Sequence, residues 1–113
     1  MTNNSAEAII VLMTAANREE AVRIAEMLVS TRLAGCVQIL PEIQSIYRWQ
    51  GAVAHDAEVL LVAKTTSGRF DELDRRVREI HSYETPEIVA MQVTAVSEPY
   101  LKWLQAAVAL GED

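Results

Sequence analysis

The sequence predicts an α+β fold in which helices cover one face of an antiparallel sheet. Short apolar runs rich in β-branched residues alternate with segments whose apolar residues recur at helical spacing. The order of these segments is strand, helix, strand, strand, helix, strand, and one further helix. With 113 residues, the chain has the size of one domain. We therefore expect a single domain over residues 1–113, with residues 1–6 as a flexible N-terminus.

The first strand is expected over residues 8–13, an apolar run typical of a strand that is buried on both faces. Asn17 with Glu20 three residues later has the spacing of a helix N-cap and its capping-box partner. The helix should run from there to about residue 33, and Gly35 should stop it.

Residues 36–49 indicate one long strand that is bent at Pro41, because a strand tolerates proline only at an edge or a bulge. Gln50 and Gly51 mark a turn, and residues 58–65 return as the second arm of a long β-hairpin. A long exposed edge tends to pair with another chain. We therefore interpret Tyr47 and Trp49 on this edge as interface anchors.

The second half of the chain repeats the strand and helix pattern. A helix is expected from Ser67 to residue 80, and Pro86 indicates that residues 81–87 form a loop. The last core strand is expected over residues 88–96, and Ser97 precedes a final helix with Pro99 in its first turn. The order βαββαβ predicts a ferredoxin-like sandwich with a long β-hairpin and an extra C-terminal helix.

Composition excludes several classes of protein. Sixteen acidic against ten basic residues give a net charge of −6, which argues against binding to nucleic acid. No apolar run reaches the roughly 20 residues that a membrane span needs. A single cysteine, Cys36, excludes an intrachain disulfide and multi-cysteine zinc motifs. The N-terminus lacks the basic region of a signal peptide, so we expect a cytoplasmic protein.

Few residues are candidates for chemistry. The sequence contains no phosphate-binding, metalloprotease or nucleophile-elbow motif, so we expect no enzymatic activity. Cys36 with His81 would suit a nucleophilic pair, although a lone strand cysteine is more often a small buried hydrophobe. His81 ends the second predicted helix, where it would either complement the helix dipole or act as a metal ligand. Tyr83, Glu84 and Glu87 follow it and could supply oxygen ligands.

Several motifs resemble those of one protein family, and they occur in its order over residues 9–110. They are Cys36-Val37-Gln38-Ile39 with Pro41, Ser45-Ile46-Tyr47-Arg48-Trp49-Gln50-Gly51, Glu58 with Leu60-Leu61 and Lys64-Thr65, His81-Ser82-Tyr83-Glu84-Thr85-Pro86-Glu87-Ile88, and Tyr100-Leu101-Lys102-Trp103-Leu104. In these motifs the chain resembles the CutA family of divalent-cation-tolerance proteins.

The resemblance implies a homotrimer of ferredoxin-like protomers, similar in architecture to PII signalling proteins. It implies tolerance of copper or another divalent cation, with copper binding in some members and no organic cofactor. The candidate metal ligands are His81 and Cys36, together with Met13 at a position where copper-binding members have a different sulfur ligand. The implied cleft and interface residues are Trp49, Tyr47, Glu58, Lys64, Tyr83 and Glu87.

Two positions depart from the family pattern. Ser82 stands where the family usually has proline, and Met13 stands where copper-binding members have cysteine. A thioether is a soft ligand that suits Cu(I) better than harder divalent ions.

Two functions therefore stay open. The first is a trimeric cation-tolerance protein that binds copper or another divalent cation weakly. The second is a PII-like sensor or scaffold whose clefts between subunits bind a small anionic metabolite or an unidentified partner protein, with Lys64 as the cationic contact. In the first case we expect His81, Tyr83 and Glu87 to line a cleft between subunits.

Overall fold

The computed structural model describes residues 5–110 of the chain. Its elements, in chain order, are β1 (Ala8–Ala15), α1 (Arg18–Ser30), β2 (Cys36–Trp49), β3 (Ala52–Thr66), the 3-10 turn η1 (Ser67–Arg69), α2 (Phe70–Ile80), β4 (Ile88–Gln92) and α3 (Glu98–Ala107).

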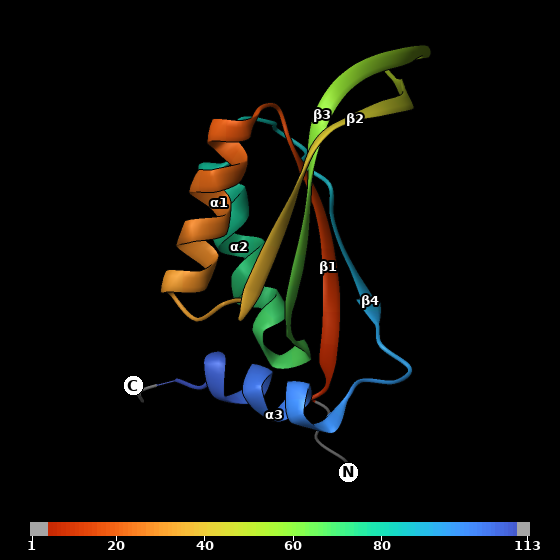
Figure 1. The fold of residues 1–113 in the computed structure, drawn as a ribbon. Coiled ribbons are helices and arrows are strands. Elements are labelled where there is room, and N and C mark those ends of the chain that lie inside the picture. Colours follow the sequence, from red (N-terminus) through yellow and green to blue (C-terminus); the bar gives the residue numbers. More distant parts are fainter. Residues whose placement is uncertain (1–4, 111–113) are drawn as a thin grey trace.

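The four strands form one sheet in the order β2-β3-β1-β4, and all neighbouring strands are antiparallel. Helices α1 and α2 lie side by side over one face of this sheet, and α3 crosses its lower end (Figure 1). This arrangement confirms the predicted ferredoxin-like sandwich with a long hairpin and an extra C-terminal helix. The far half of the hairpin extends beyond the helices, so part of it has no helical cover (Figure 1).

The core lies between the sheet and the helices. Val11, Met13 and Leu61 are fully buried on the sheet side, and they pack with Ile24 and Leu73 from the two helices. On the opposite face of β1, Ala8, Ile10 and Leu12 are only partly buried. The prediction that the first strand is buried on both faces is therefore wrong for the single chain, because helices cover only one side of the sheet.

The hairpin follows the predicted pattern, except that its second arm begins at Ala52, directly after the turn, rather than at residue 58. Its register shifts between Leu40 and Ile43, so a bulge lies at Pro41, and β2 is an edge strand as expected. Gln50 and Gly51 form the turn with φ angles of 49° and 80°. Two successive residues with positive φ are typical of a type I′ turn, whose twist matches that of the strands it joins.

Helix α1 ends earlier than predicted. It stops at Ser30, and Arg32 adopts a positive φ of 62°. The amides of Arg32 and Leu33 donate to carbonyls of the last turn, which is the Schellman pattern with arginine in the usual glycine position. Gly35 has a different role, since a Cβ there would lie 2.7 Å from Leu104 Cδ1. Glycine at this position lets α3 approach the α1–β2 connection.

The last strand is also shorter than predicted, ending at Gln92 rather than residue 96. Gln92 pairs with Ile9, and β1 begins one residue earlier at Ala8, so β4 has almost no further partner on β1. The residues that follow leave the sheet and lead to α3 (Figure 1).

Hydrogen bonds to η1 and α3 hold the start of the described N-terminal segment in place. Residues 1–4 of the predicted flexible N-terminus lie outside the described residues. The carbonyls of Ser5 and Ala6 accept hydrogen bonds from the Gly68 amide and the Gln105 side chain, at 2.9 and 3.0 Å. Within residues 5–110, no helix is both long and apolar enough to cross a membrane.

Candidate functional site

The loop over residues 81–87 is tied to the start of α1 by the buried carboxylate of Glu20. This carboxylate accepts hydrogen bonds from the Ala16 amide at 2.9 Å, the Ser82 amide at 2.6 Å and the Ser82 hydroxyl at 3.0 Å. The Asn17 side chain accepts from the Glu20 amide at 2.8 Å, as the predicted N-cap requires. Burial raises the pKa of Glu20, but the hydrogen bonds from Ala16 and Ser82 outweigh it, so the pKa lies below its usual value.

His81 is a buried link between this loop and β1. Its side chain has no exposed surface, and its Nε2 lies 2.8 Å from the carbonyl oxygen of Thr14. Its Nδ1 accepts the amide hydrogen of Tyr83 at 3.0 Å, which places the ring proton on Nε2. Both ring nitrogens are thus in hydrogen bonds within the chain. The imidazole therefore holds the 81–87 loop against the end of β1.

Tyr83 extends from His81 toward β3. Its ring lies against the His81 ring, with centroids 4.8 Å apart and planes tilted by 50°. Its hydroxyl donates to the Glu58 carboxylate at 2.7 Å. Burial and this hydrogen bond hold the pKa of Tyr83 well above its usual value. Tyr83 therefore remains a neutral donor to Glu58.

A second hydrogen-bonded pair of a tyrosine and a carboxylate lies on the hairpin. The Tyr47 hydroxyl donates to Asp56 on the neighbouring strand, and this hydrogen bond raises the pKa of Tyr47. Both tyrosine rings are thus fixed by carboxylates at their hydroxyl ends.

These side chains border a cavity of about 910 Å³ between the hairpin and the 81–87 loop. Its lining includes three aromatic residues and four carboxylates, with no lysine or arginine among the described residues. Five of the predicted cleft residues meet here. The lining consists of Thr14, Ala16, Gln44, Ser45, Ile46, Tyr47, Trp49, Asp56, Ala57, Glu58, Tyr83, Glu84, Thr85 and Glu87. We call this cavity the acidic cleft.

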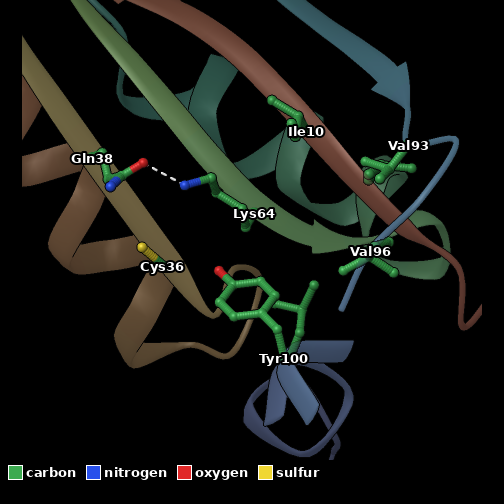
Figure 2. A pocket seen from close by; sticks show the side chains of 10 residues that line it. Ile10, Cys36, Gln38, Lys64, Val93, Val96 and Tyr100 are labelled. Carbon is green, nitrogen blue, oxygen red and sulfur yellow. Dashed lines mark hydrogen bonds between the residues drawn. The ribbon is translucent and has the colours of Figure 1, made fainter. Parts of the chain in front are cut away.

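Lys64, the sixth predicted cleft residue, lies elsewhere. It borders a smaller pocket of about 380 Å³ together with Cys36 and Tyr100, beside α3 (Figure 2). The Lys64 ammonium donates to the side-chain oxygen of Gln38 (Figure 2). The pocket is mostly apolar, and burial together with Cys36 raises the pKa of Tyr100. Lys64 and the acidic cleft therefore belong to separate sites, because they sit on different stretches of β3.

The three predicted metal ligands occupy separate places in the chain. Met13 is fully buried in the core, whereas Cys36 is partly exposed at the start of β2. Cys36 on β2 pairs with Lys64 on β3, which in turn pairs with Ile10 on β1. His81 bonds to Thr14, which lies four residues further along β1 than Ile10. That separation is about 13 Å at the rise of a β-strand. Within residues 5–110 no three histidine, cysteine or acidic side chains are grouped to hold a metal ion. Metal binding by these residues stays a prediction.

Sequence reasoning missed two residues of this site. Glu20 was predicted only as a capping-box partner, although its carboxylate also anchors Ser82. Asp56 gave no signal, since an acidic residue near a hairpin turn is ordinary. The register between β2 and β3, which places Asp56 opposite Ser45, brings it to Tyr47.

Comparison with known proteins identifies the family. The sequence profile of the CutA1 divalent ion tolerance protein family matches residues 9–107. The chain belongs to the CutA1 divalent ion tolerance family. The divalent-cation tolerance protein CutA of Thermus thermophilus is 48% identical over 96 residues, which cover 85% of this chain and 93% of that protein.

More distant members of the CutA1 family agree in sequence and in fold. The chloroplastic CutA protein of Arabidopsis thaliana is 38% identical over 92% of this chain, but the chain spans only 57% of its length. The crystal structure of CutA1 from Oryza sativa superposes with a TM-score of 0.90 at 36% identity. That superposition covers 96% of this chain and all of the rice chain.

Proposed function

We propose that this CutA1 family member is a homotrimeric divalent-cation tolerance protein that binds copper or another divalent cation weakly, without enzymatic activity. The family match over residues 9–107 carries this proposal. A relative that shares 48% identity is itself a divalent-cation tolerance protein. The cytoplasmic location, and any partner protein of another kind, stay predictions.

The uncovered face of the sheet supports a homotrimer. Seven apolar side chains lie on the face opposite the helices, where a solvated antiparallel sheet normally carries polar residues. They are partly or largely exposed in the single chain: Ile10, Leu12, Leu40, Leu60, Val62, Val89 and Met91.

The strand edges support the same assembly. β2 and β4 are the two edges of the sheet, and Trp49 on β2 is 49% exposed. Pairing the edges with neighbouring subunits in a closed ring would remove open edges, and three-fold symmetry is a common closed arrangement.

The charge of the chain supports cation binding. Its net charge is −6, which favours the approach of cations to its surface. A single chain offers at most one soft thiolate, at Cys36, for copper. A metal site on one chain is therefore sparse, which supports weak binding or a site shared between subunits.

No observation favours the PII-like alternative. A small anionic metabolite would face four carboxylates in the acidic cleft, and no lysine or arginine lines that cleft among the described residues. Like charges repel strongly where solvent is partly excluded. Lys64, the cationic contact of that hypothesis, lies in the other pocket.

Two measurements test the proposal. Light scattering should give about three times the chain mass of 12.5 kDa, and a stable monomer at micromolar concentration would refute the trimer. Titration with Cu(I), Cu(II) and Zn(II) should give weak binding, and the Cu(I) affinity should fall in Cys36→Ser. Thermal unfolding of each variant controls for loss of fold. Absence of binding for all three ions would refute the cation-binding part.

The same titration examines the other predicted ligands. His81→Ala and Met13→Leu should be measured beside Cys36→Ser. Equal Cu(I) affinity in the wild type and all three variants would remove this set of residues from the metal site.

A further inference from the structure

Glu58 presents to the acidic cleft a largely buried carboxylate whose two oxygens differ: one is bonded within the chain and the other is accessible. Its residue is only 8% exposed, and its Oε2 accepts from Tyr83. Within residues 5–110, no donor reaches its Oε1. This oxygen is not fully buried, since Thr65 Oγ1 is the one side-chain nitrogen or oxygen atom of residues 5–110 that is buried without a partner. It is therefore open to a ligand, and a hydrogen bond from a charged donor is among the strongest that a carboxylate can accept. The base of the cleft therefore favours a ligand that brings an N–H or O–H group, preferably cationic.

The rim of the cleft reinforces the choice of a cation. Asp56, Glu84 and Glu87 add three carboxylates to that of Glu58, and no described lysine or arginine lines the cavity. Arg75 and Arg78 form their ion pairs with acids of α2 itself, and neither lines the cleft. Bringing a positive charge into the cleft relieves the repulsion among these groups.

The aromatic residues of the cleft distinguish an organic cation from a metal ion. Tyr47, Trp49 and Tyr83 line the same cavity as the carboxylates. Aromatic faces attract ammonium groups within about 6 Å of the ring centre. Hydroxyl bonds to Asp56 and Glu58 fix the two tyrosines, so their rings need little ordering when a ligand binds.

The size of the acidic cleft and the spacing of its carboxylates also favour an organic cation over a metal ion. The cavity holds about 910 Å³, which is the size of a site for a small organic molecule and far larger than one metal ion. No three acidic, histidine or cysteine side chains of residues 5–110 are close enough together to bind one metal ion. The carboxylates are thus spread as they would be around an extended cation.

We propose that the acidic cleft binds an aliphatic cation with two or more primary or secondary ammonium groups. One ammonium would donate to Glu58 Oε1 beside the Tyr83 ring, and another would meet the carboxylates of Glu84 and Glu87 at the rim. A quaternary ammonium would bind less well, because it has no N–H for Glu58. This inference goes beyond the proposed tolerance of divalent metals, since it assigns an organic ligand to a separate site from Cys36.

Calorimetric titration with 1,4-diaminobutane tests the proposal on the full chain in its native assembly. Mg²⁺ has the same charge without N–H groups or a carbon chain, and tetramethylammonium lacks N–H donors. We expect the diamine to bind more tightly than both. Glu58→Gln should raise its Kd about tenfold, as expected for loss of a charged hydrogen bond. Glu26→Gln is the matched control, because it removes an exposed carboxylate on α1 outside the cleft.

A second readout locates the ligand. The chain has two tryptophans, and only Trp49 lines the cleft, so Trp103→Phe leaves Trp49 as the fluorescent reporter. The diamine should change the fluorescence of this variant, and adding Glu87→Gln should weaken the response.

Three results would overturn the proposal: no binding of the diamine at millimolar concentration, equal binding of Mg²⁺, or equal effects of Glu58→Gln and Glu26→Gln. None of them bears on copper binding in the Cys36→Ser titration, so the two proposals fail separately.

Discussion

Replacing Glu20 tests whether the acidic cleft depends on the link between α1 and the 81–87 loop. In Glu20→Ala, the carboxylate that accepts from the Ala16 amide and from both donors of Ser82 is lost. Because this loop carries His81 and Tyr83, the change should loosen one wall of the cleft as well as the start of the helix.

The size of the loss follows from the donors left behind. Two backbone amides lose a charged acceptor, and a buried donor without a partner costs about 1–3 kcal/mol. Ala16 and Ser82 are themselves largely exposed, so water can replace part of the lost bonding. We therefore expect the free energy of unfolding to fall by about 2–3 kcal/mol, near the lower end of the sum for two donors. Glu19→Ala is the control, because it changes an exposed neighbour on the same helix. It should change the free energy of unfolding by about 0.5 kcal/mol or less.

Urea unfolding at one fixed protein concentration measures these changes, since an oligomer's apparent stability depends on concentration. The pH dependence gives a second check. The pKa of Glu20 is lower in the folded chain than its unfolded value of 4.5, so its stabilising contribution is present above pH 4.5 and is lost as pH falls through the folded pKa. The difference between wild type and Glu20→Gln should therefore shrink in acid. A loss below about 1 kcal/mol for Glu20→Ala at neutral pH would refute this account of the link.

Three further substitutions probe other parts of the chain. Trp49→Ala should weaken the association of the proposed trimer by about 2 kcal/mol or more, because interface tryptophans often dominate binding. If light scattering shows that the variant keeps its mass on dilution, this expectation is wrong. Gly35→Ala should lower the free energy of unfolding by about 1–3 kcal/mol, because the new Cβ would contact Leu104 Cδ1. The loss should be smaller in a Leu104→Ala background, and urea unfolding of the single and double variants measures this difference. Tyr83→Phe removes the donor to Glu58 and should lower the free energy of unfolding at neutral pH by about 1–2 kcal/mol, as measured by urea unfolding. An unchanged free energy of unfolding would mean that water replaces the hydroxyl fully.

Local patterns in the sequence were sufficient for the order and type of the elements. The alternation in the hairpin, the Asn17 cap and the Gln50-Gly51 turn all depend on residues within a few positions of each other, and each was confirmed. Element ends depend on neighbours in space, so α1 and β4 end earlier than the local pattern predicts. Arg32 takes the position expected of glycine at the end of α1, and Gly35 is required by α3.

The sequence by itself thus determined the ferredoxin-like fold, the long edge strand and the acidic character of the chain. Only the tertiary structure decided which polar groups share a site. His81 bonds to Thr14 across 67 positions, Ser82 to Glu20 across 62, and Tyr83 to Glu58 across 25. No periodicity or spacing relates such residues. Strand register and helix packing bring them together, and the same geometry keeps Cys36, Met13 and His81 apart within one chain.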